Sequence, residues 1–184
     1  FDQISRILQY LLTTGSRKKI PRQEIVATLG LSDRQVESLI SVSVGFGLVK
    51  PRTSILTPLG KIIAEKDVYF ERIETLWLVH YIISSNPEWV VWHRIVNQIL
   101  PMNDRIVISE VALPYFSDLK SSFSERTLKA KLPGEIGAVL QSYIQSSLSR
   151  LNLLRKEQTG IYHKETTADI PPLAFLYQLL HFRE

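Results

Sequence analysis

The sequence predicts a mainly α-helical protein, in which two winged helix-turn-helix-like units with small β-hairpin wings surround a central pair of buried helices. Three observations support this. Apolar residues recur at helical spacing through much of the 184-residue chain. Both ends of the chain show the order of helices, a hairpin and a proline-led helix. The most apolar stretch, residues 74–100, contains all three tryptophans and lies between them.

The distribution of charge and of helix-ending residues divides the chain into three segments. Residues 1–66, an N-terminal winged-helix-like unit, have ten Lys and Arg against five Asp and Glu. Residues 67–104, the tryptophan-rich helical pair, have two against five, and residues 105–184, a C-terminal helical unit with a hairpin, have ten against eight. The basic excess of the first segment is typical of a protein with a polyanionic partner, but an ordinary solvated surface explains it equally well.

Composition excludes several classes of protein. No apolar run approaches the ~18 residues of a membrane-spanning helix, so no membrane partner is expected. The chain has no cysteine, which excludes disulfides, thiolate zinc sites and cysteine catalysis. We therefore expect a cytoplasmic protein. Since the sequence begins at Phe1 rather than at a methionine, a preceding segment that completes the domain remains an open alternative.

The first segment has the pattern of a helix-turn-helix. An amphipathic helix is predicted over residues 4–12, ending at Gly15. A second helix starts at Pro21 and ends at Gly30. Ser32 then precedes a third helix, with Gln35 in the position of a capping box. A short helix, a glycine turn and a capped helix together are typical of this motif.

A hairpin and a further helix complete the first segment. Two short β-like runs within residues 45–57 surround a basic tip at Lys50 and Arg52, and this is the expected wing. Thr57 is expected to cap the next helix, with Pro58 in its first turn.

The central segment is predicted to be two buried helices joined at Asn86-Pro87, with Pro87 at the start of the second helix. Trp77 and Trp92 are expected to be buried, because the apolar residues surround both helices. His80 and His93 invite an acid/base or metal interpretation. Each lies on an aromatic-rich face without a second histidine one turn away, so a partly buried histidine that donates to a backbone carbonyl is the expected state.

The third segment is expected to begin with a helix over residues 106–116, which Pro114 shortens or kinks. Ser124 is expected to cap the next helix, and Pro133-Gly134 to break it. A long helix is then predicted over residues 136–151.

Residues 153–164 are predicted to form a hairpin that turns at Thr159-Gly160, and Pro171-Pro172 opens a final apolar helix. This order of elements resembles that of the first segment, so a second winged helix is one interpretation of the C-terminal unit.

Nucleic-acid binding, with DNA as the expected ligand, is the function that this pattern favours. The third helix would enter the major groove, where Arg34 and Gln35 are candidates to contact base edges. Asp33 and Glu37 on the same face would repel phosphate. The full set of candidate nucleic-acid-binding residues is Arg17, Lys18, Lys19, Arg22, Arg34, Gln35, Lys50, Arg52, Arg126 and Lys129.

No catalytic, metal or cofactor motif is present in the sequence. It lacks a glycine-rich phosphate loop, HExxH, GxSxG and a cluster of aspartates, so we expect no enzyme, no cofactor and no metal. Two alternatives remain: a protein-interaction adaptor that uses the same fold without DNA, and an enzyme subunit whose site the sequence does not reveal. A homodimer is also open.

Three phrases stand out together: Leu56–Gly60 (LTPLG), Glu74–Tyr81 (ETLWLVHY) and Ser84–Pro87 (SSNP). The C-terminal run Ile161–Leu180 adds a hairpin followed by a PPLAFLYQLL helix. In this order they resemble the prokaryotic family called domain of unknown function 4007 (DUF4007), with its L-T-x-L-G, T-L-W-L-L-H-W and S-N-P phrases. The likeness spans about residues 20 to 182.

The resemblance implies a genomic context rather than a biochemical activity. Genes of that family are often found near DNA-modification and phage-defence genes, so a regulator or accessory factor that works with proteins of such a system is expected. Members usually have G-V-G-K-N-M-V at the third helix. The equivalent here, Gly30–Val36 (GLSDRQV), lacks the lysine and adds an acid, which argues against sequence-specific reading by this helix.

Overall fold

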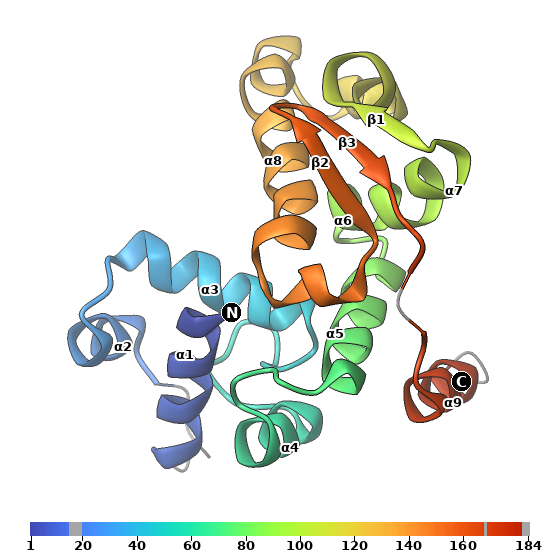
Figure 1. Ribbon diagram of the computed structural model, residues 1–184. Coiled ribbons are helices and arrows are strands. Elements are labelled where there is room, and N and C mark those ends of the chain that lie inside the picture. The colour runs from blue at the N-terminus through green and yellow to red at the C-terminus, as the bar shows by residue number, and fades with distance from the viewer. Residues whose placement is uncertain (15–19, 168, 182–184) are drawn as a thin grey trace. The chain divides into compact units, whose positions relative to one another are not determined.

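The computed structural model describes residues 1–14, 20–167 and 169–181 (Figure 1). In these residues the chain is mainly helical with a small antiparallel sheet, as predicted. Contacts group the chain into two compact units, of which unit 1 comprises residues 1–83 and 171–184 and unit 2 comprises residues 84–170. A grouping by contacts does not test a division by composition, so the three segments stay a prediction.

Unit 1 consists of helices and one tight hairpin. Its elements are α1 (Asp2–Thr13), α2 (Arg22–Leu29), α3 (Asp33–Gly45), α4 (Pro58–Lys66), most of α5 (Ile73–Ser85) and α9 (Pro172–His181). Local signals set the helix starts. Ser32 and Gln35 form the predicted capping box of α3. Thr57 caps α4 by accepting from the backbone N–H of Gly60 at 2.9 Å. The predicted helix end at Gly15 lies outside the described residues.

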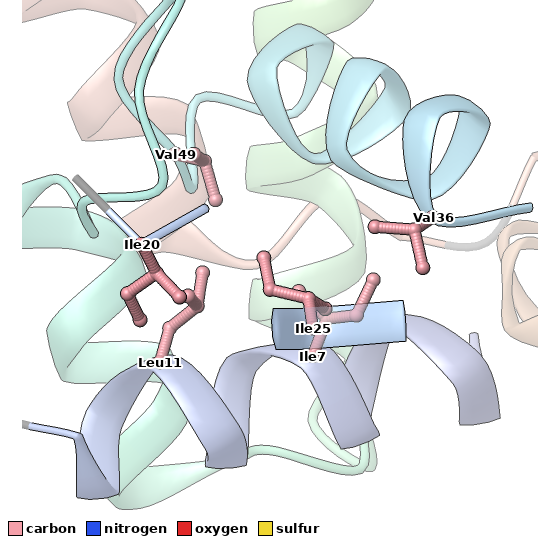
Figure 2. Packing of buried hydrophobic residues seen from close by; sticks show 6 residues of the cluster. All are labelled: Ile7, Leu11, Ile20, Ile25, Val36 and Val49. Carbon is pink, nitrogen blue, oxygen red and sulfur yellow. The ribbon is translucent and has the colours of Figure 1, made fainter. Parts of the chain in front are cut away.

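The core of unit 1 lies where α1, α2, α3 and the hairpin after α3 meet. Figure 2 shows its side chains converging between α1 and α3. They are Ile7, Leu11, Ile20, Ile25, Val36 and Val49. Each contributes roughly 1.5–3 kcal/mol by leaving water, so this cluster fixes the position of α3 against α1 and α2. Gly30 ends α2 at a φ of 64°, a left-handed conformation that favours glycine and turns the chain sharply into α3.

The hairpin after α3 brings two segments of backbone into close contact with α4. Val49 pairs with Leu56, the N–H of Lys50 donates to the carbonyl of Ile55 at 2.9 Å, and the N–H of Thr57 donates to the carbonyl of Leu48 at 2.9 Å. The same Leu48 carbonyl oxygen lies only 1.9 Å from where a Cβ on Gly60 would be. Only glycine therefore allows α4 to approach the hairpin this closely.

Unit 2 combines short helices, one long helix and the three-stranded sheet. Its elements are α6 (Val90–Arg94), η1 (Ile95–Ile99), α7 (Leu100–Met102), β1 (Arg105–Val107), η2 (Ile108–Ala112), η3 (Leu113–Ser121), α8 (Glu125–Gln145), η4 (Ser147–Leu151), β2 (Leu154–Gln158) and β3 (Ile161–Lys164). The strands are antiparallel in the order β1-β3-β2, and Gly160 turns the β2–β3 hairpin at a φ of 78° as predicted. Strand β1 joins this sheet by pairing Ile106 with Tyr162.

Helix α8 is the centre of the core of unit 2. It buries residues along its length: Leu132, Ile136, Val139, Leu140 and Tyr143. Trp92 of α6 donates its indole N–H to the hydroxyl of Tyr143 at 2.6 Å, and the two rings meet edge to face. This hydrogen bond satisfies both buried polar groups and fixes α6 against α8.

The predicted helix break at Pro133-Gly134 is wrong, because α8 continues through it from Glu125 to Gln145. A proline inside a helix removes one backbone hydrogen bond and costs ~3 kcal/mol. Burial of apolar side chains on both sides of Pro133 outweighs this cost. The helix predicted over residues 136–151 ends earlier, at Gln145, and a 3-10 turn, η4, takes over.

Two further predictions need correction. The helix after Pro87 begins at Val90, because the side chain of Asn86 accepts from the N–H of Glu88 and keeps Pro87 in a turn. Residues 106–116 are not a kinked helix but β1 followed by η2 and the start of η3.

The two buried tryptophans belong to different units. Trp77 lies on α5 in unit 1, and Trp92 on α6 in unit 2. The apolar stretch is therefore buried as the sequence predicts, but it contributes to two cores.

The close approach at Gly60 predicts opposite effects for two glycine-to-alanine substitutions. Gly60→Ala forces a methyl group into the Leu48 carbonyl and is expected to lower the free energy of unfolding by at least about 2 kcal/mol. Gly134→Ala on α8 meets open space and is expected to raise it by about 0.5–1 kcal/mol, since alanine favours helix. Urea unfolding of both variants measures the difference. Equal effects at the two positions would contradict the packing described.

Candidate nucleic-acid interface

The candidate binding residues fall into three groups around α3, the hairpin and α8. Arg17, Lys18 and Lys19 lie outside the described residues, so their position adds nothing to these groups. The remaining candidates divide between unit 1 and unit 2.

The exposed face of α3 is largely occupied by its own contacts. Arg22 Nε lies 2.9 Å from a carboxylate oxygen of Asp33, and its NH1 atom lies 3.3 Å from Glu37. The side chain of Gln35 accepts from the backbone N–H of Ser32 at 2.9 Å. Two predicted contacts to nucleic acid are thus engaged within the protein. The same ion pairs partly neutralise the two carboxylates that would repel phosphate.

Arg34 remains as an exposed cation on α3, without an ion pair to any described residue. One such cation beside two carboxylates and one arginine leaves this face close to neutral. Base reading by α3 therefore has little support from its charges.

The hairpin of unit 1 presents two cations at its tip. Lys50 and Arg52 are exposed, and neither forms an ion pair with a described residue. Arg52 has a φ of 59°, which places it in a left-handed turn position between the two arms. A short projecting tip with two cations is suited to contact phosphates, although two charges provide only a small electrostatic contribution.

The start of α8 carries a group of basic residues in unit 2. Ser124 caps the helix by accepting from the N–H of Thr127. Lys120 precedes the cap, and the first two turns add the exposed side chains of Arg126, Lys129 and Lys131. We call these four cations the α8 basic cluster: Lys120, Arg126, Lys129 and Lys131.

One carboxylate lies within the α8 basic cluster. Lys129 Nζ lies 2.9 Å from Glu125, and both side chains are well exposed. Hydrogen bonding to Lys129 and the nearby charges of Lys129 and Lys120 lower the pKa of the Glu125 carboxyl. Because both side chains are exposed and the pair is screened by salt, Lys129 can leave Glu125 and bind a phosphate instead.

A hollow of about 330 Å³ adjoins the α8 basic cluster. Its walls are mainly apolar, from Leu113, Phe116 and Leu132, and two members of the cluster, Lys120 and Lys129, line it with Glu125. Of the four members of the cluster, Arg126 and Lys129 are among the candidate residues predicted from the sequence, and Lys120 and Lys131 are not.

The hairpin of unit 2 neutralises some of its own charges. Glu157 accepts from Nε2 of His163 at 2.6 Å and pairs with Arg105 at 3.2 Å, and these contacts lower its pKa. Arg155 pairs with Glu165 at 2.7 Å. Arg105 and Arg155 are therefore paired, whereas Lys156 and Lys164 on the same strands are exposed and form no ion pair with a described residue.

The two central histidines differ in burial and in their contacts. Nδ1 of His93 lies 2.8 Å from the backbone carbonyl of Ser84, which is the predicted arrangement. His80 is buried, and desolvation lowers its pKa from 6.5 to about 4. Among the residues that the structure describes, no group of three His, Asp or Glu is placed to hold a metal ion.

The described helices include none that is both long and apolar enough to cross a bilayer. Residues 11–184 match the family described as "Protein of unknown function (DUF4007)". No curated protein and no solved structure is significantly similar to the chain.

His80 makes the stability of unit 1 sensitive to acid. Above about pH 6.5 the imidazole is neutral in both states. As the pH falls toward 4, the unfolded chain takes up a proton that the buried ring resists, so folding loses up to about 3 kcal/mol. Urea unfolding between about pH 7 and pH 4 should show a shallower loss for His80→Gln than for the wild type. The comparison uses the slope, because the substitution also alters packing; parallel slopes would contradict the prediction.

Proposed function

Since the chain belongs to the DUF4007 family, we propose that it is a nucleic-acid-binding protein that holds DNA chiefly by its phosphates. The observation that carries this proposal is the α8 basic cluster, four exposed cations around the capped start of a long helix. A helix N-terminus adds its own positive end and free backbone N–H groups, which favour an anion.

The proposed architecture is a winged helix-turn-helix in each unit. In unit 2 the order is helical segment, β1, η2–η3, α8, β2 and β3, with β1 beside β3 in the sheet. This order supports η3 as the first helix of the motif, α8 as the second, and the β2–β3 hairpin as the wing. In winged helices of this type the second helix approaches DNA, and in unit 2 that helix carries the cations.

Unit 1 supports a simpler version of the same arrangement. Its α2, the Gly30 turn and α3 provide the helix pair, and the hairpin of residues 48–57 provides the wing. With α3 close to neutral, Lys50 and Arg52 at the wing tip are the proposed contacts of this unit. They add phosphate contacts rather than base contacts.

Binding through phosphates implies a particular role. Contacts to the backbone provide affinity and orientation but little sequence information. An accessory factor that keeps partner proteins on DNA, rather than a regulator that finds one operator, fits this division. The partners proposed are proteins of a DNA-modification or phage-defence system, for which the family resemblance is the support, and the chain itself is proposed to bind rather than to catalyse.

The salt dependence of DNA binding tests this proposal. Each phosphate contact contributes about 0.9 to the slope of log affinity against log salt. The double substitution Arg126→Gln and Lys129→Gln, at positions three residues apart on one face of α8, is therefore expected to reduce the slope by about 2 and to weaken binding to every duplex alike. Fluorescence anisotropy with two duplexes of unrelated sequence at several salt concentrations provides the measurement.

A matched control removes the same charge elsewhere. Lys61 and Lys66 are exposed on α4, outside both proposed contact surfaces, so Lys61→Gln with Lys66→Gln should leave the slope unchanged. No binding of the wild type at low salt, or an equal loss in both double variants, would refute the proposal.

A protein-interaction adaptor is the second candidate function. The neutral, internally paired face of α3 favours it, because interfaces between proteins tolerate paired charges better than a DNA surface does. Failure of the wild type to bind DNA at low salt would favour this candidate.

A further inference from the structure

Helix α9 presents large apolar side chains to solvent. Five residues within Pro172–His181 are between 48% and 73% exposed: Leu173, Phe175, Leu176, Leu179 and Leu180. We call them the α9 apolar face. Ala174, by contrast, is fully buried, and the ring of Tyr177 meets that of Tyr81 on α5 edge-on at 6.4 Å. The helix is thus attached to unit 1 through Ala174 and Tyr177.

The helical period separates these two faces. At 100° per residue the five exposed residues fall within an arc of about 160°, and Ala174, Tyr177 and Gln178 occupy the opposite side. A helix on the surface of a globular protein normally buries its apolar arc. In α9 the more apolar arc faces outward, which is the pattern of a helix that is covered by something else.

We propose that the α9 apolar face binds the same face of a second copy of the chain, as an antiparallel helix pair in a symmetric homodimer. This inference does not depend on the proposed function, because it rests on α9 alone.

The area of the face is sufficient for such a dimer. Large side chains bury roughly 150–250 Å² each when fully covered, so five that are about half exposed offer roughly 500 Å². Two copies together then bury roughly 1,000 Å², the lower limit for a specific interface, before any neighbouring residue contributes. A single patch of this size is also at the upper end of what monomers expose.

The chemistry of the face favours a copy over a foreign partner. No Asp, Glu, Lys or Arg occurs between Pro172 and Leu180, so two copies meet without repulsion. Partners that associate and separate usually select each other through charged and polar groups, which this face does not offer. A purely apolar face requires a partner that is present at all times. A second copy of the chain meets this requirement, because it is present whenever the protein is.

The pairing geometry follows from symmetry. In an antiparallel pair related by a two-fold axis, residue i of one helix meets residue j of the other, and j meets i. Three exposed leucines, Leu173, Leu176 and Leu180, have the three- and four-residue spacing of residues at a helix–helix contact. Leu176, near the middle of this contact, is therefore expected to lie beside Leu176 of the second copy.

Molar mass in solution tests the dimer. The wild-type chain of 21.1 kDa is expected to elute at twice that mass in size-exclusion chromatography with light scattering. Leu176→Glu with Leu180→Glu should reduce the mass to that of one chain, because four buried carboxylates would meet across the axis. Ile62→Glu with Met102→Glu adds the same charge at exposed apolar residues outside α9 and should leave the dimer intact.

Cysteine crosslinking keeps the test independent of folding defects in the glutamate variant. The chain has no cysteine of its own, so Leu176→Cys introduces a single thiol. Mild oxidation is expected to join two chains of this variant in high yield, and to leave Ile62→Cys uncrosslinked. A wild-type protein that remains monomeric up to about 1 mM, or a glutamate variant that stays dimeric, overturns the proposal. Equal crosslinking at the two positions does so as well.

Discussion

The hydrogen bond from Trp92 to Tyr143 is the interaction on which unit 2 depends. A tyrosine hydroxyl and an indole N–H that are both buried must find partners, or each costs about 1–3 kcal/mol. Here each satisfies the other at 2.6 Å, so α6 and α8 are fixed in one relative position. The apolar residues that α8 buries hold it as one helix from Glu125 to Gln145, with the α8 basic cluster at its start.

Local features of the fold were predictable from the sequence, and distant pairings were not. Ser32, Thr57 and Ser124 cap the helices that they were expected to cap, because a cap depends on residues three positions apart. Strand β1 was missed, since its partner β3 is more than fifty residues further along the chain. The helix break predicted at Pro133 was wrong for a similar reason. A proline destabilises a helix locally, but burial of apolar side chains against elements distant in the sequence outweighs this cost.

For the candidate interface, too, the residue types were predictable from the sequence and their contacts were not. The sequence identifies the cations, and it shows that the third helix also carries Asp33 and Glu37. It does not reveal that Arg22 is held between Asp33 and Glu37, or that Gln35 is used as a cap. Ion pairing thus engages Arg22 of α2 and capping engages Gln35 of α3, and the proposed contacts move to α8, whose cations are exposed.

Weak phosphate contacts and a dimer are physically complementary. A few cations bound to phosphates give an affinity that physiological salt largely cancels. Two such surfaces in one assembly bind with the second contact at a high effective concentration, so the combined affinity can exceed either one by 10²-fold or more. The proposed pairing through the α9 apolar face is not weakened by salt, because burial of apolar surface has no charge to screen. In the proposed dimer, association through α9 would preserve the proposed DNA binding at salt concentrations at which a single α8 basic cluster would release DNA.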